Sequence, residues 1–319
     1  MTEYTVKQRV SASDDNVHSE WDRTLDPVVT VESGDIVSFE CRDAWNGLID
    51  EGTTAAGVPK ALEQRDGGMP ITGPVAVEGA SPGDVLAIEI LRVEHDDWGW
   101  TSFRPKADEF GLLYEEFDEW GLHYWHLADG VGEFVDGIEV PLNPFPGTIG
   151  LAPADESKRS MGPPHDAGGN MDTKHLTAGT TLYLPVEVKD ALLSIGDGHA
   201  AQGDGEICGG AIETPITIDV RLEVQSDRNI AQPQYRMPQG TASRAGVQTY
   251  STTGISDDLM DATRKATLAM VNHLQDERGL RAHDAYILAS VAADLKINEV
   301  VDRPNWVVSS HIPEDIFPE

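Results

Sequence analysis

The chain has 319 residues, and its 55 Asp and Glu outnumber its 23 Lys and Arg, which gives a formal net charge of −32. So acidic a surface repels nucleic acid and anionic membranes, and we expect neither as a partner. Apolar residues occur along the whole chain, so the composition is typical of a folded protein rather than a disordered one. The simplest explanation is adaptation to high salt, where screening over about 3 Å at 1 M weakens the self-repulsion.

Two cysteines, Cys41 and Cys208, are too few for a disulfide framework and do not form a thiolate zinc motif. The first ten residues lack the apolar segment of a signal peptide, and no run reaches the roughly 18 apolar residues of a membrane span. We therefore expect a soluble, cytoplasmic, halophilic protein. The length allows one large β domain or two smaller ones.

The first 225 residues read mainly as strands. Residues 28–31 and 36–40 alternate around a Glu-Ser-Gly-Asp turn, which favours a hairpin. Residues 74–77 and 85–90 form a second strand–turn–strand unit around Gly83-Asp84. Residues 51–69 are Gly-rich and polar, which predicts a loop. The Trp-rich stretch 95–140 is expected to cap the core or form an interface.

The character of the chain changes after residue 225. Ser256 is placed to cap a helix over 257–275, and Gly279 is placed to end it. A second helix is predicted over 284–295, followed by short strands near 300–303 and 306–308. The helix-containing part therefore spans 226–319 and follows a β-rich part of 1–225.

The stretch 196–213, GDGHAAQGDGEICGGAIE, holds six glycines, with acids and a histidine between them. Its flanks predict two strands joined by a turn near Gly205, which would place Asp197 opposite Glu213 and His199 opposite Ala211. Asp197 and His199 then point to the same face, and opposed carboxylates about 5 Å apart favour a cation between them. The competing interpretation is that these acids are solvated turn residues of a very acidic chain.

Other polar residues offer weaker signals. His18 and Asp43 follow or lie between the first strands and are candidate ligands or substrate contacts. Asn170 follows paired glycines that permit close backbone approach, and it could bind a small amide or fix a loop. Glu206 lies near the predicted turn tip.

Several motifs together resemble the acetamidase/formamidase family. They are GPVAVEGASPGDVLAIEI at 73–90, NPFPGTIGLAP at 143–153, GGNMDTKHLTAGTTLYLPV at 168–186, the stretch 196–213 and DAYILASVAADLKINEVVD at 284–302. The resemblance runs over most of the chain, so 1–319 is expected to be one catalytic unit. It implies a mainly β, jelly-roll-like β-sandwich with a C-terminal pair of helices. It also implies hydrolysis of formamide, acetamide or another short aliphatic amide. One departure is Gly47-Leu48, where the family would lead us to expect Gly-Gln.

The resemblance also implies a metal-dependent site in the stretch 196–213, in which a divalent ion activates water and a carboxylate moves its proton. We expect the metal ligands to be Asp197, His199 and Asp43, and the ion to be zinc, with calcium or manganese as alternatives. The remaining predicted site residues are the catalytic carboxylates Glu213 (alternatively a third ligand) and Glu206, and the substrate contacts Asn170, Asp172 and His18.

Two alternatives stay open at this point. Cys208 could serve as a thiolate nucleophile, although its apolar and acidic neighbours do not favour a low pKa. The Trp-rich residues 98–125 could instead belong to a metal-stabilised, non-catalytic β-sandwich that binds carbohydrate. A large β-rich protein with an aromatic excursion is further expected to be a homo-oligomer.

Overall fold

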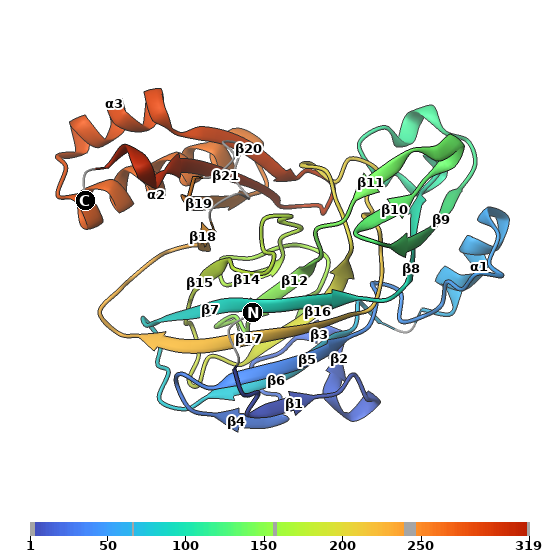
Figure 1. Ribbon diagram of the computed structural model, residues 1–319, viewed down its shortest axis with the longest axis horizontal. Coiled ribbons are helices and arrows are strands. Elements are labelled where there is room, and N and C mark those ends of the chain that lie inside the picture. Colours follow the sequence, from blue (N-terminus) through green and yellow to red (C-terminus); the bar gives the residue numbers. More distant parts are fainter. Residues whose placement is uncertain (1–3, 66, 156–157, 239–246, 318–319) are drawn as a thin grey trace.

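The computed structural model describes residues 4–65, 67–155, 158–238 and 247–317 (Figure 1). It confirms a mainly β protein with a C-terminal pair of helices, built from several sheets. The strands are β1 (Gln8–Val10), β2 (Val17–His18), β3 (Glu20–Trp21), β4 (Val29–Val31), β5 (Ile36–Cys41), β6 (Ile71–Val77), β7 (Val85–His95), β8 (Trp98–Phe103), β9 (Gly121–Ala128), β10 (Val131–Glu133), β11 (Glu139–Pro141), β12 (Phe145–Leu151), β13 (Arg159–Ser160), β14 (Gly168–Asn170), β15 (Thr181–Pro185), β16 (Leu193–His199), β17 (Ile216–Gln225), β18 (Gln234–Met237), β19 (Thr249–Ser256), β20 (Asp294–Glu299) and β21 (Trp306–Pro313). The α-helices are α1 (Val58–Glu63), α2 (Leu259–Arg278) and α3 (Ala282–Ala292).

Two large sheets carry the fold. One has nine strands in the order β1-β5-β17-β7-β15-β18-β19-β21-β20, and the other has the order β14-β12-β16-β6-β2, with β4 also paired to β6. A four-stranded sheet, β11-β10-β9-β8, contains much of the Trp-rich excursion, and β13 pairs with β3. The jelly-roll description of this arrangement stays a prediction.

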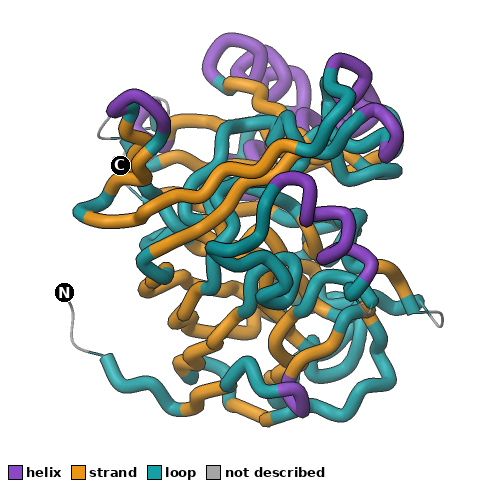
Figure 2. Tube along the Cα trace, turned by 90° about the vertical axis from the view of Figure 1, so that its right-hand side faces the viewer, coloured by secondary structure: helices purple, strands orange, loops and turns teal. Residues whose placement is uncertain are grey.

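The main core lies between the two large sheets. Phe39 of β5 and Ile218 of β17, from the nine-stranded sheet, share one buried cluster with Val75 of β6, Ile149 of β12 and Ile195 of β16, from the other sheet. The alternating pattern read from the sequence places these apolar side chains on inward faces, and their burial is the main favourable term in folding. In Figure 2 the strands stack below the helical part of the molecule.

The predicted hairpins are wrong, although their strands are correct. β4 pairs with β6, whereas β5 pairs with β1 and β17 in the other large sheet. In the same way β6 and β7 lie in different sheets, and so do β16 and β17. Turn residues and alternation identify where a strand begins and ends, but the choice of partner depends on which sheet face buries the side chains.

The two predicted C-terminal helices are present, although their first and last residues differ from the prediction. α2 begins after Asp258, whose carboxylate accepts a hydrogen bond from the Asp261 amide at 2.7 Å, so the cap is Asp258 rather than Ser256. Gly279 ends α2 with a φ of 65°, as predicted. The second helix stops at Ala292, and residues 294–299 form β20.

Two other local predictions are wrong or incomplete. Residues 300–303 are not a strand, and α1 lies within the stretch predicted as loop. Val58 and Ala61 of α1 are buried against Trp45 and Trp100, so a short helix forms where tertiary packing stabilises it. Among the described residues, no helix is long and apolar enough to cross a membrane.

Candidate active site

A cavity of about 260 Å³ lies where the end of β16 meets the loop that follows it. Its lining includes six of the predicted site residues, Asn170, Asp172, Asp197, His199, Glu206 and Glu213, and also Asp302, Arg65 and Arg104. A larger cavity of about 1170 Å³ next to α2 and β18 contains none of the predicted site residues. The smaller cavity is therefore the candidate active site.

The end of β16 brings a histidine and two carboxylates together. His199 Nε2 lies 3.4 Å from Asp197 Oδ1 and 3.3 Å from Glu213 Oε2, and all three residues are buried. The register differs from the prediction, because His199, not Asp197, is the residue that bridges to Glu213. The slip amounts to two residues, and since side chains alternate with a period of two, the predicted face is retained.

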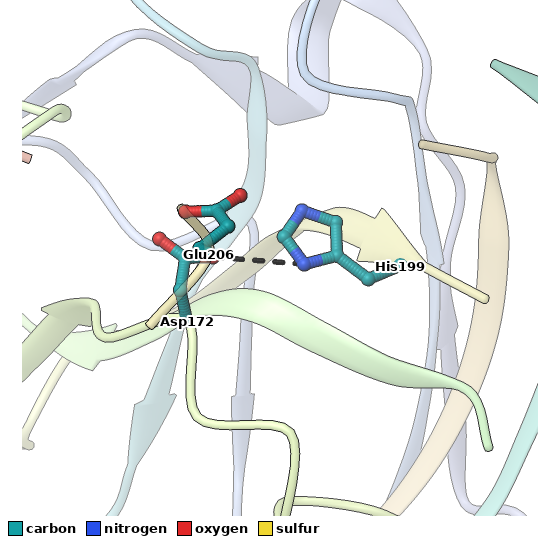
Figure 3. Close-up of side chains that lie close together, drawn as sticks. All are labelled: Asp172, His199 and Glu206. Carbon is teal, nitrogen blue, oxygen red and sulfur yellow. Dashed lines mark ion pairs between the residues drawn. The ribbon is translucent and has the colours of Figure 1, made fainter. Parts of the chain in front are cut away.

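The other ring nitrogen of His199 faces a second pair of acids (Figure 3). Nδ1 lies 3.6 Å from Asp172 Oδ1, and Glu206 closes the group. Two groups of three residues each bring their possible ligand atoms within 4.8 Å of one another. One group is Asp172, His199 and Glu206, and the other is Asp197, His199 and Glu213. Four acids from three chain segments thus converge on one imidazole.

The backbone is shaped to permit this crowding. A Cβ at Gly147 of β12 would lie 2.6 Å from both Asp172 Oδ1 and His199 Cε1, so only glycine fits there. Asp172, Asp197 and Glu206 all have positive φ, at 41°, 58° and 46°. Such conformations are uncommon for residues with a Cβ and persist where the surrounding structure imposes them, often at functional sites.

Gln202 determines which nitrogen of His199 carries the proton. Its Nε2 donates to the Asp172 carbonyl oxygen at 2.7 Å, which fixes the amide orientation and leaves Oε1 as an acceptor. Oε1 lies 3.0 Å from His199 Nδ1, so Nδ1 is the donor in this hydrogen bond. In a neutral imidazole the lone pair is then on Nε2, facing Asp197 and Glu213.

Burial and mutual proximity shift the pKa of Asp172, His199, Glu206 and Glu213. Burial raises the pKa of Glu206 well above its ordinary value, and Asp172 raises it further. Burial and Asp302 act in the same direction on the pKa of Asp172. Burial lowers the pKa of His199, but Glu213 and Asp197 overcome this effect and hold it well above its ordinary value. The cluster therefore holds more buried carboxylates than its single histidine can neutralise.

The donor set fits a divalent cation. Asp197 Oδ1, Glu213 Oε2 and Asp172 Oδ1 are buried and have no hydrogen-bond partner among the described residues. Buried carboxylate oxygens without partners are costly unless they are paired or coordinate a metal. Without a cation these carboxylates favour the imidazolium, and a bound cation would take the place of its Nε2 proton. Asp197, His199 and Glu213 would then offer one nitrogen and two oxygens to one ion, while Asp172 and Glu206 lie on the Nδ1 side of the ring.

The other predicted site residues are placed differently. Asn170 lines the cavity, but its amide nitrogen donates to Asp302 at 2.8 Å and its oxygen accepts from Thr148 at 2.5 Å. Asp43 accepts from the amides of Trp45 and Gly47, and it belongs to neither group of metal-binding geometry found in the described part of the chain.

His18 is engaged at both ring nitrogens and does not line the cavity. They lie 2.9 Å from the Glu20 carbonyl oxygen and 2.9 Å from Ser194 Oγ. The substrate-binding role of His18 and the metal-binding role of Asp43 stay predictions that these contacts do not favour.

Cys208 has the environment of a structural thiol. Its Sγ donates to the Gly210 carbonyl oxygen at 3.4 Å, and burial raises its pKa. Its side chain does not line the cavity, unlike the glycines that follow it. A raised pKa leaves little thiolate at neutral pH, which disfavours a nucleophilic role.

Several residues that line the cavity or contact His199 were not predicted from the sequence. Gln202 follows His199 by three residues within the stretch singled out from the sequence, so its proximity was a usable signal. Arg65, Arg104 and Asp302 come from distant segments, and their local sequence carries no sign of a shared site. Only the sheet topology brings them together.

Taken together, the mainly β fold and the buried histidine–carboxylate centre define a hydrolase-type site that can hold a metal ion. A family model described as the acetamidase/formamidase family matches residues 3–162 and 154–319, and the chain belongs to this family. Membership confirms the predicted family and the prediction of a hydrolase that acts on the carbon–nitrogen bonds of linear amides. It leaves the carbohydrate-binding alternative without support.

Individual relatives agree with this placement. The chain is 28% identical to a formamidase of Methylophilus methylotrophus, over 95% of this chain and 90% of that protein. It is 26% identical to an acetamidase of Mycolicibacterium smegmatis over 65% of each chain. The crystal structure of an acetamidase from Bacillus halodurans matches with a TM-score of 0.85 and 31% identity, covering 97% of this chain and 98% of that one.

Proposed function

We propose that this protein hydrolyses short aliphatic amides, formamide or acetamide, to a carboxylate and ammonia, using water activated at a divalent ion held by Asp197, His199 and Glu213. The observation that carries the ligand assignment is the hydrogen bond between His199 Nδ1 and Gln202, which leaves Nε2 free to face two unpartnered carboxylate oxygens. Support for the substrate class comes from relatives named formamidase and acetamidase.

Zinc is the proposed ion, because a set of histidine and carboxylate ligands with an open position is typical of catalytic zinc. When bound, such an ion lowers the pKa of a coordinated water to about 7 and polarises the amide carbonyl. Calcium or manganese would fit if the oxygen ligands dominate.

Residues of the chain itself are proposed to transfer the protons and to orient the histidine. With Glu213 assigned as a ligand, Glu206 is the proposed proton acceptor for the attacking water, and it returns the proton to the departing nitrogen. Burial and the nearby Asp172 raise the pKa of Glu206, and a more basic carboxylate is a better proton acceptor for the attacking water. Asp172 and Gln202 contact the imidazole at its Nδ1 side and fix its orientation.

Three expected properties remain part of this proposal. The net charge of −32 supports a protein that works at high salt, and we place it in the cytoplasm. Homo-oligomerisation is supported by the exposed apolar side chains Tyr286, Ile287 and Val291 on α3, since such patches often mark interfaces.

The direct test is ammonia release from formamide and acetamide in molar salt, before and after metal removal by a chelator and after addition of zinc. We expect activity to disappear with the metal and to return with zinc, and Asp197→Asn and His199→Ala to lose both metal and activity. Full turnover by metal-free protein would refute the metal mechanism. A failure to release ammonia from any short amide would refute the proposed substrate class.

A further inference from the structure

Two arginines in the cavity wall lack an acidic partner. Arg65 and Arg104 line the cavity, and neither forms an ion pair with any residue that the structure describes. Arg42, Arg92 and Arg281, for comparison, each contact an aspartate at 2.7–2.9 Å.

Both arginine side chains are half-buried in the cavity wall. Burial lowers the pKa of Arg65 and of Arg104, and the two are close enough that Arg65 lowers the pKa of Arg104 further. The Nε of Arg65 is fully buried and has no hydrogen-bond partner among the described residues. Arg104 packs over the Phe110 ring, with its guanidinium carbon 4.3 Å from the ring centroid. Buried donors are normally hydrogen-bonded, so the Arg65 Nε indicates a missing acceptor at this side of the cavity.

The acids of the cluster stabilise the charge of the two arginines from a distance but do not form ion pairs with them. Asp197 and Glu213 raise the pKa of Arg65 through space, and Asp302 does the same for Arg104. None of these carboxylates lies within 4 Å of either guanidinium as an ion pair in the described residues. A divalent ion at Asp197 and Glu213 would neutralise part of that charge and leave the arginines free to attract an anion.

We infer that Arg65 and Arg104 form a carboxylate-binding subsite of the cavity, which holds the acid product of amide hydrolysis. The inference rests on the proposed function for the identity of the ligand. A guanidinium presents parallel N–H donors that match the two oxygens of a carboxylate, whereas a neutral amide offers only its carbonyl oxygen. The subsite therefore binds the product acid better than the substrate and makes formate or acetate an inhibitor. The second product, ammonia, has no attraction to this side of the cavity.

The test uses acetate as the probe and does not require turnover. Acetate binding to the zinc-loaded protein is measured by calorimetry at a fixed sodium chloride concentration, so that chloride competes equally in every variant. We expect Arg65→Met and Arg104→Met each to weaken acetate binding by about tenfold or more, since each removes charge-assisted hydrogen bonds. Arg65→Lys, which keeps the charge but loses the planar fork, should fall between Arg65→Met and the unaltered protein.

Two controls separate a binding role from a structural one. Arg221→Met removes an arginine that pairs with Glu89 on the neighbouring strand of the nine-stranded sheet, outside the cavity lining, and it should leave acetate affinity unchanged. Zinc content and inhibition by ammonium should be unchanged in the Arg65 and Arg104 variants. The inference is overturned if acetate does not bind the unaltered protein, or if both Met variants bind it equally well. Because binding is measured without catalysis, a protein that binds acetate through these arginines but releases no ammonia would refute the proposed function alone.

Discussion

Replacement of Gln202 by leucine tests the ligand assignment most directly. The change keeps a side chain of similar size but removes the acceptor of the 3.0 Å hydrogen bond from His199 Nδ1 and the donor of the 2.7 Å bond to the Asp172 carbonyl. His199 is only 1% exposed, so water cannot readily replace the lost acceptor at its ring. Loss of such an outer partner of a metal-binding histidine weakens metal affinity by about 10- to 100-fold, or about 1.4–2.7 kcal/mol.

The assay is competition for zinc against a chelator of known affinity, together with ¹⁵N NMR of the histidine rings in the zinc-loaded protein. The unaltered protein should show His199 bound to zinc through Nε2, with a protonated Nδ1. Gln202→Glu retains an acceptor and should keep zinc affinity closer to that of the unaltered protein than Gln202→Leu does. Gln234→Leu is a matched control, because Gln234 is also buried and hydrogen-bonded, to Arg228 and Tyr250, but lies outside the site. The reasoning is refuted if Gln202→Leu binds zinc as tightly as the unaltered protein, or if zinc occupies Nδ1.

The remaining predictions concern the proton acceptor, the thiol and the response to acid. Glu206→Gln should lower kcat for amide hydrolysis by about 10²- to 10⁴-fold while zinc content stays constant; an unchanged kcat would exclude Glu206 as the base. Cys208→Ala should leave ammonia release within about twofold, because the buried thiol carries little thiolate; complete loss in a folded, zinc-loaded variant would restore the nucleophile hypothesis. Burial holds the pKa of His165 at about 3, below the ordinary 6.5, so from about pH 6.5 down to 3 the unfolded chain binds a proton that the folded protein does not. Stability should therefore decrease as pH falls through that range, by up to about 1.4 kcal/mol per unit from this group, and chemical denaturation of His165→Phe should show a shallower dependence; an equal slope in both proteins would contradict this origin.

The sequence predicted which polar side chains lie close together where they belong to one short stretch, and their roles stay predictions. Asp197, His199 and Glu213 were placed on one face of a strand pair, and the structure brings them within hydrogen-bonding or near-contact distance of one another. The register was wrong by two residues, an error that preserves the face because side chains alternate along a strand. Asp43 and His18 had no such support, and neither lines the cavity: Asp43 accepts from backbone amides, and His18 is hydrogen-bonded to Glu20 and Ser194.

Strand partners could not be obtained in this way. The turns at 32–35 and 78–84 have the composition of hairpin turns, yet each connects one large sheet to the other. Composition of a turn specifies a reversal of the chain, whereas the burial of Val31 and Val77 between the sheets determines which strands pair.

By itself, the sequence determined the β-rich character, the two C-terminal helices, the family and the strand that carries His199. These features depend on residue type and short-range periodicity, which are present in any segment taken alone. Only the tertiary structure decided that Gly147 must lack a side chain, that Gln202 orients the imidazole, and that Arg65 and Arg104 face the same cavity as the acids. Those relations join residues far apart in the chain or depend on exact side-chain direction, and they arise when the two sheets pack together and exclude water from the space between them.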